Sequence, residues 1–177
     1  MSDISNYNII IIDSDNAIYN NGSNNLHYYI KLEDNIRDVY KIKILYNAVS
    51  IPTANLKGGA PFLTKNLDTI YININDYDRI KSNYIAPDNS IITLKSFDAI
   101  IIDVNKIKTI DGITTTTMCN DFNENEGNYY LQPIESNFDR IEIKLVNKKN
   151  EVITKDFISR VVIKLCVYYN TKKISQF

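Results

Sequence analysis

The residues of this chain that could do acid–base or metal chemistry are few in kind. There is one histidine, His27, in the segment "LHYYIKL". A serine or cysteine nucleophile needs a base, and most zinc or iron sites on β-sandwiches need two or more imidazoles, so His27 alone would have to serve every such scheme. We therefore expect His27 to be a packed or hydrogen-bonded strand residue. We also expect the chain to use no metal or other cofactor.

Paired carboxylates are the second candidate, because a glycosidase needs only two of them on facing strands. The candidate acids are Asp76, Asp78, Asp139 and Glu142. The bases beside them in sequence are Arg79, Arg140 and Lys144. A neighbouring base lowers a carboxyl pKa, whereas a general acid requires a raised one. The pattern therefore favours a protein that is not an enzyme, with no catalytic residues to assign.

The segment "DFNENEG", residues 121–127, partly fits a calcium-binding loop. Asp121, Asn123 and Asn125 occupy the first three ligand positions of that pattern. However, Glu126 stands where the turn glycine belongs, and Gln132 stands where a bidentate glutamate should close the shell. The segment is more typical of a polar surface loop.

The elements that position these residues are predicted by apolar side chains at every second position, which is the pattern of half-buried strands. In "RIEIKLV", Ile141, Ile143 and Leu145 share one face, and "TIYININ" and "VYKIKILY" alternate in the same way. "FDAIIIDVNKI" and "RVVIKLCVYY" have longer β-branched runs, as interior strands do. A helix over residues 155–168 is the alternative for the last segment, but its β-branched residues favour a strand.

The connections are predicted at "LKGGAPF" (residues 56–62), "APDNS" (86–90) and a long polar segment (114–128). No repeat or linker divides the 177 residues, so we expect one domain. About eight or nine strands with long loops indicate an all-β fold, an antiparallel β-sandwich wound as a Greek key or a jelly roll. Residues 1–8 are interpreted as an N-terminal arm.

Composition restricts the partners. With 20 basic and 21 acidic residues the net charge is -1, so no whole-chain footprint for nucleic acid or an anionic membrane is visible. No apolar run approaches the 18 or more residues that span a bilayer, and no secretion signal is recognised, so we expect no membrane insertion and synthesis in the cytoplasm. Cys119 and Cys166 are too few for a disulfide framework, and Cys166 is expected to be buried in a strand. The sequon at Asn21 is interpreted as a turn.

Four segments, taken in order, resemble the single jelly-roll minor capsid and penton proteins of the large nucleocytoplasmic (giant) DNA viruses. They are "YIKLEDNIRDVYKIKILYNAVSIP", "TIYININDYDRI", "FDAIIIDV" and "YYLQPIESNFDRIEIKLVNKKNEVI". Together they span residues 28–153. Two departures from the family pattern stand out: Phe138 replaces a usual leucine, and "NKKNEV" lacks the usual turn glycine, so a longer loop is expected there.

The resemblance implies a single jelly-roll domain over residues 9–177 and a structural role in the virion. The expected role is the five-fold vertex (penton) or another minor capsid position of an icosahedral particle. The implied partners are the chain itself, as a homopentamer, and the major or other minor capsid proteins. In that role, Asp78 with Arg79 and Asp139 with Arg140 are interpreted as strand-end ion pairs or turn anchors. Replacing Arg140 with alanine is then expected to weaken folding or assembly.

A β-sandwich module that binds glycans or a host protein is the alternative function. It would present an aromatic shelf on exposed loops. The tyrosines expected to form such a shelf are Tyr77, Tyr84, Tyr129 and Tyr130.

Overall fold

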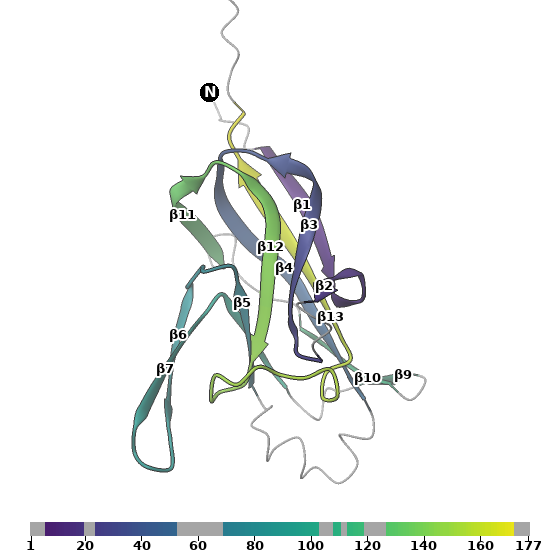
Figure 1. Ribbon diagram of the computed structural model, residues 1–177, viewed down its shortest axis with the longest axis vertical. Coiled ribbons are helices and arrows are strands. Elements are labelled where there is room, and N and C mark those ends of the chain that lie inside the picture. The colour runs from purple at the N-terminus through teal and green to yellow at the C-terminus, as the bar shows by residue number, and fades with distance from the viewer. Residues whose placement is uncertain are drawn as a thin grey trace, which may run out of the picture.

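The structure is a computed structural model, which describes residues 6–19, 24–52, 69–102, 108–110, 113–118 and 127–171 (Figure 1). Strands dominate these residues, with one short 3-10 helix, η1 (Ser14–Asn16). The strands are β1 (Asn6–Asp13), β2 (Ile18–Tyr19), β3 (His27–Ile36), β4 (Val39–Pro52), β5 (Thr69–Ile74), β6 (Ile80–Ile85), β7 (Ile91–Ser96), β8 (Asp98–Ile101), β9 (Lys108–Ile110), β10 (Ile113–Met118), β11 (Asn128–Glu135), β12 (Phe138–Val146) and β13 (Arg160–Tyr169).

The strands form two antiparallel sheets and a separate hairpin (Figure 1). The first sheet has the order β1-β13-β4-β10-β9, and β11 also pairs with β4. The second sheet has the order β2-β3-β12-β5-β8. Strands β6 and β7 pair only with each other among the described residues. The expected all-β fold, an antiparallel sandwich, is confirmed.

Eight strands pair in a nested arrangement. β1 pairs with β13, β3 with β12, β4 with β11, and β5 with β8. The strands that come early in the chain are thus joined to strands that come late, in reverse order. As a result the first and second sheets each receive strands from both halves of the chain.

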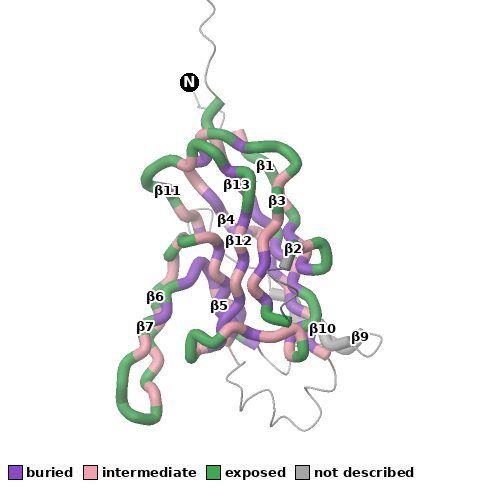
Figure 2. Tube along the Cα trace, in the orientation of Figure 1, coloured by how far each residue is buried: buried purple, intermediate pink, exposed green. Residues whose placement is uncertain are grey.

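The core lies between the two sheets, where Figure 2 shows the buried segments. A single hydrophobic cluster holds residues of both sheets. The inward-facing residues of the interior strands are Ile141, Ile143 and Leu145 of β12 and Val161, Ile163, Leu165 and Val167 of β13, none of them exposed. Each such side chain contributes about 2 kcal/mol through burial. Burial of the apolar face of these strands is therefore a main source of the stability of the fold.

Strand β13 confirms the preference for a strand over a helix near the C-terminus. It lies between β1 and β4, as an interior strand. Its β-branched residues suit this position because both neighbours pack against them. Cys166 belongs to this strand and is buried, as expected, whereas Cys119 lies outside the described residues.

The turn after β12 is the loop without glycine that the sequence indicates. Val146 and Val152 form an isolated bridge on either side of residues 147–151. Asn150 takes a positive φ of 64°, the conformation that glycine would otherwise supply. The Oδ1 atom of Asn147 accepts hydrogen bonds from the backbone N–H groups of Lys149 and Glu151. An asparagine side chain thus replaces part of the backbone hydrogen bonding of a shorter turn.

Several loop and terminus predictions change. The prediction of a loop over residues 114–128 is wrong at both ends, because residues 114–118 belong to β10 and Asn128 begins β11. A run of threonines looked polar, but threonine is β-branched and fits a strand. Residues 6–8 of the expected arm pair with β13 as part of β1. Residues 1–5 and 56–62, the sequon at Asn21 and the calcium-like segment over residues 121–126 lie outside the described residues.

The β6–β7 hairpin was not predicted as a pair of strands, although its turn over residues 86–90 was. It projects from the body of the sandwich at the lower left of Figure 1. Leu94 packs against Tyr71 and Val146 on the outer face of the second sheet, and Ile92 packs against this cluster. Among the described residues, no helix is long and apolar enough to cross a membrane.

Candidate functional site

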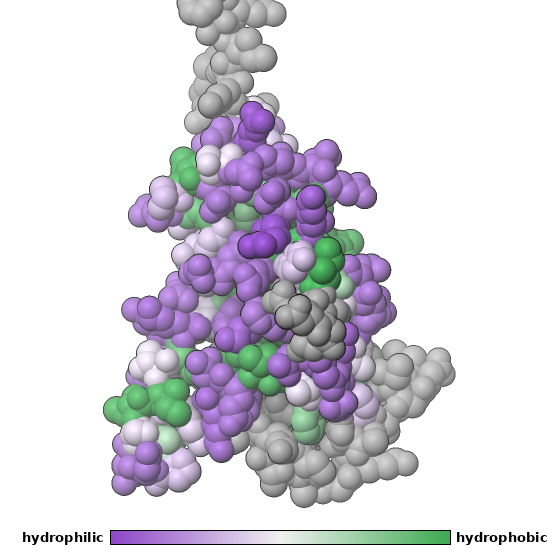
Figure 3. Space-filling model, viewed as in Figure 1, coloured by the Kyte–Doolittle hydropathy of each residue, from purple (hydrophilic) through white to green (hydrophobic). Residues whose placement is uncertain are grey.

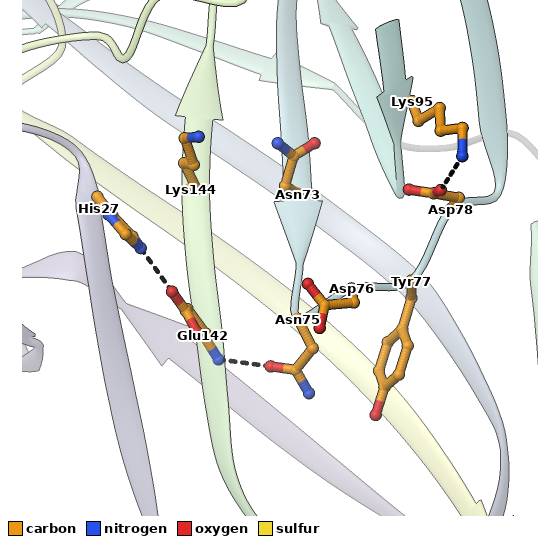
Figure 4. A pocket seen from close by; sticks show the side chains of 9 residues that line it. All are labelled: His27, Asn73, Asn75, Asp76, Tyr77, Asp78, Lys95, Glu142 and Lys144. Atoms are coloured by element: carbon orange, nitrogen blue, oxygen red, sulfur yellow. Dashed lines mark hydrogen bonds and ion pairs between the residues drawn. The ribbon is translucent and has the colours of Figure 1, made fainter. Parts of the chain in front are cut away.

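A polar pocket lies on the outer face of the second sheet, beside the base of the β6–β7 hairpin (Figure 4). Its volume is about 360 Å³. Its ionisable side chains, apart from Tyr77, are His27, Asp76, Asp78, Lys95, Glu142 and Lys144. Three of the four acids predicted from the sequence thus meet the single histidine, and Asp139 does not.

His27 and Glu142 are neighbours because β3 and β12 pair antiparallel. The Nε2 atom of His27 lies 2.5 Å from Oε1 of Glu142, and both side chains are partly exposed. This contact confirms the expectation that the histidine is a hydrogen-bonded strand residue. An exposed pair of this kind contributes little to stability.

Asn75 fixes the edge of the pocket next to Glu142. Its backbone N–H donates to the carbonyl oxygen of Glu142 over 2.9 Å, and its Oδ1 atom accepts from the Glu142 N–H over 2.7 Å. Asn75 has a φ of 45°, a conformation that asparagine tolerates better than most residues. The backbone therefore bends sharply after β5, and this bend brings Asp76, Tyr77 and Asp78 round the pocket.

The side chains that line the pocket supply hydrogen-bond donors and acceptors. None of the described residues that line it is a serine, threonine or cysteine, so the pair of His27 and Glu142 has no nucleophile to activate there. No group of three or more His, Cys, Asp or Glu residues in the described part of the chain could hold a metal ion. The Oδ1 atom of Asn73 is buried without a partner, so it offers an unused acceptor.

Arg79 is the anchor that the sequence suggested, but its partner is Asp98 rather than Asp78. Arg79 Nη2 lies 2.9 Å from Asp98 Oδ1, and Nε donates to the carbonyl oxygen of Phe97 over 2.9 Å. Asp98 also accepts a hydrogen bond from Nδ2 of Asn47 on the first sheet over 3.2 Å. This buried network joins the start of the β6–β7 hairpin to its end and to the opposite sheet. Asp78 instead contacts Lys95 at 3.3 Å, at the surface.

Asp139 and Arg140 form no ion pair with each other among the described residues. Both are exposed, at the point where the pairing of β12 with β3 shifts register. The Arg140 guanidinium lies 5.5 Å from the centre of the Tyr29 ring. Adjacent residues of a strand point to opposite faces, so an exposed bulge is where both can face solvent. Arg140 is therefore a surface cation that lies on an aromatic ring.

A further ion pair, which sequence reasoning missed, holds the edge strand β1. Arg160 Nε donates to Asp13 Oδ1 over 3.0 Å, and Arg160 Nη2 contacts Asp13 Oδ2. The side-chain hydrogen bond with Arg160 holds the pKa of Asp13 below its ordinary value of 3.8. The two residues are far apart in sequence, so only the pairing of β1 with β13 brings them together.

The four tyrosines expected to form an aromatic shelf do not lie together. Tyr77 and Tyr129 stack with ring centres 5.3 Å apart, but both pack against the core. Burial raises the pKa of Tyr77 to about 12. Tyr84 lies on the hairpin, near Lys148, and Tyr130 is exposed on β11.

Large exposed apolar side chains mark two other surfaces. Ile85 and Ile91 lie at the tip of the β6–β7 hairpin, where Figure 3 shows an apolar patch. Ile9 and Ile11 lie on β1, beside a groove of about 470 Å³ between β1 and β3. Such positions on a hairpin tip and an edge strand are typical of contacts with another protein.

Comparison with known proteins gives no family: no family model matches the chain, and a search of curated proteins finds no significant match.

Proposed function

We propose that this chain is a structural virion protein, a single jelly roll at a five-fold vertex or another minor position of the icosahedral capsid of a large DNA virus. It acts by associating with copies of itself and with the major or other minor capsid proteins. It is localised in the virion after synthesis in the host cytoplasm, and it catalyses no reaction.

The observation that carries the proposal is the nested pairing of the eight strands. A long two-stranded ribbon, wound over itself, gives the pairs β1–β13, β3–β12, β4–β11 and β5–β8. We interpret that winding as a jelly roll, an architecture that recurs in viral capsid domains. Because many unrelated functions share this architecture, the capsid role also depends on the four segments that resemble the capsid family.

Surface features support the role independently. The long edge strand β1 has the exposed side chains Tyr7, Ile9 and Ile11, and it carries neither the lysine nor the proline that commonly protects an edge. The net charge of -1 leaves little self-repulsion to oppose the packing of identical copies. These features suit a module that covers its edges by assembly.

Immunogold labelling tests the proposal directly. An antibody raised against the purified chain should label intact virus particles purified from cells that express the chain, and the protein should sediment with them. Particles that lack the protein, with the chain found only in the non-particle fraction, would contradict the virion role.

The alternative function, a module that binds glycans or a host protein, draws support from the polar pocket. Its side chains supply both donors and acceptors, and Asn73 Oδ1 is an acceptor without a partner. Saturation-transfer NMR with methyl glycosides of common monosaccharides tests this alternative. Transfer that disappears in Asn73→Ala would favour it, and no transfer from any sugar would count against a glycan.

A further inference from the structure

The tip of the β6–β7 hairpin presents two exposed isoleucines beside a hydrogen-bonded turn. Ile85 and Ile91 are directly paired across its two strands, and 67% and 69% of their surface is exposed. The adjoining turn is held by hydrogen bonds: the Ala86 N–H donates to the Ser90 carbonyl oxygen, and the Ser90 N–H and hydroxyl donate to Asp88. The isoleucine pair therefore adjoins a hydrogen-bonded turn, and Figure 2 shows the tip of the hairpin as exposed.

The two faces of the hairpin differ. The inner face packs on the sandwich through Leu94, which is 2% exposed. The outer face carries the isoleucine pair at the tip and, nearer the base, Lys81 directly opposite Lys95. Two like charges facing each other across a ribbon are unfavourable, and Asp78, 3.3 Å from Lys95, balances one of the two. An anionic partner surface would balance Lys81 as well and would cover the apolar tip at the same time.

The groove between β1 and β3 carries the complementary pattern. Ile9 and Ile11 line it on β1, and Leu32, Glu33 and Asp34 line it on β3. Glu33 and Asp34 are exposed, and neither forms an ion pair with a described residue. An apolar strip with two carboxylates thus matches the chemistry of an apolar tip with two lysines farther along the same face.

The two surfaces belong to different ends of the strand order. The hairpin packs on β5 and β8, at one end of the second sheet, whereas β3 lies towards the other end and β1 is an edge of the first sheet. In Figure 1 the hairpin and the pair of β1 and β3 lie on opposite sides of the molecule. One copy therefore cannot fill its own groove with its own hairpin, and the match points to a second copy.

We propose that the hairpin tip of one copy binds the β1–β3 groove of the next copy of this chain. The isoleucine pair packs against Ile9 and Ile11, and the two lysines face Glu33 and Asp34. Such a contact joins different surfaces, and its repetition closes a ring when the rotation between successive copies divides a full turn. The inference rests on the proposed capsid role, to which it adds the interface between neighbouring copies.

A charge exchange tests this interface. One variant carries Lys81→Glu and Lys95→Glu, a second carries Glu33→Lys and Asp34→Lys, and a third carries all four changes. Each reversal alone places like charges across the contact, and we expect the concentration for half-dissociation of the oligomer to rise at least about tenfold. The third variant restores opposite charges, so its oligomer should return. Mass photometry over a dilution series measures the concentration for half-dissociation of each variant.

Matched controls separate folding from assembly. Ile85→Ser with Ile91→Ser should dissociate the oligomer, whereas Ile101→Ser, a change at a 63% exposed residue of β8 outside both surfaces, should not. Circular dichroism must show the same fold and melting temperature for every variant. If the parent chain assembles and the reversed variants assemble equally well, or the fourfold variant is not restored, this interface is wrong and the capsid role stands. A parent that stays monomeric would overturn both this interface and the vertex role, and would leave another minor capsid position or the binding module.

Discussion

Arg79 and Asp98 form a buried ion pair that joins the β6–β7 hairpin to the sandwich. Their closest atoms are 2.9 Å apart, with side-chain exposures of 16% and 3%. The hairpin begins just after Arg79 and ends just before Asp98, so the pair closes the hairpin at its base. The position of the hairpin, and of the polar pocket beside it, therefore depends on these two residues.

Replacing Arg79 with alanine should strongly destabilise the fold. It leaves the carboxylate of Asp98 buried without its cation, and removing one partner of a buried pair costs about 3 kcal/mol. Urea unfolding followed by circular dichroism measures this loss. The control is Asp78→Ala, which breaks only the exposed contact with Lys95 and should cost less than about 1 kcal/mol. Equal losses in the two variants would show that Arg79 is not an anchor.

The pair of Asp13 and Arg160 should make stability depend on pH in the acid range. Because Arg160 lowers the pKa of Asp13 in the folded state, the stabilisation is complete above the ordinary value of 3.8 and is lost as the pH falls through the folded value. The urea midpoint of the parent should therefore fall as the pH is lowered from about 5 to about 2. Arg160→Gln should be less stable at neutral pH and should lose less on acidification. An identical slope in both proteins would contradict this.

Replacing Asn75 with alanine should destabilise the fold more than replacing it with glycine. The alanine variant loses the hydrogen bond to the Glu142 N–H, which costs about 1 kcal/mol of stability. Alanine is also strained at a φ of 45°, which costs about 1 kcal/mol more. Glycine loses the hydrogen bond but accepts the conformation. Thermal unfolding of the two variants separates these contributions. If alanine is as stable as glycine, the backbone at Asn75 is not strained.

Arg140→Ala should have only a small effect on folding. The side chain is exposed and contacts the ring of Tyr29 without an ion pair to a described residue, so the loss should stay below about 1 kcal/mol. The sequence alone led us to expect weaker folding or assembly from this change. A loss as large as that of Arg79→Ala would restore the view of Arg140 as a structural anchor.

Much of the sandwich was predictable, because strands with one buried face leave a period-two pattern. Strands β5 and β12 follow it closely, and the buried face of β12 was assigned correctly from Ile141, Ile143 and Leu145. Strand β13 was predicted instead from its run of β-branched residues. Strand β6 has a weaker pattern, since Ser82 lies on its inner face and bonds the hydroxyl of Tyr71. Strand β10 is a threonine run whose β-branching was the available signal.

The contacts around the pocket could not be predicted, because they join residues that are distant in sequence. Glu142 meets His27 through strand pairing, and Arg79 meets Asp98 across the whole hairpin. Charged neighbours such as Asp78 and Arg79 suggested a pair, but Asp78 contacts Lys95 and Arg79 contacts Asp98. The sequence thus identified Arg79 as an anchor without identifying what it holds.

Native mass spectrometry of the purified full chain tests the central claim, self-assembly as a capsid protein, most directly. The account predicts one dominant closed oligomer, with a mass of five times the 20.4 kDa of a single chain. It should form at micromolar concentration and persist at physiological salt, because its contact combines apolar and charged surfaces. A chain that remains monomeric over the whole concentration range would contradict the account.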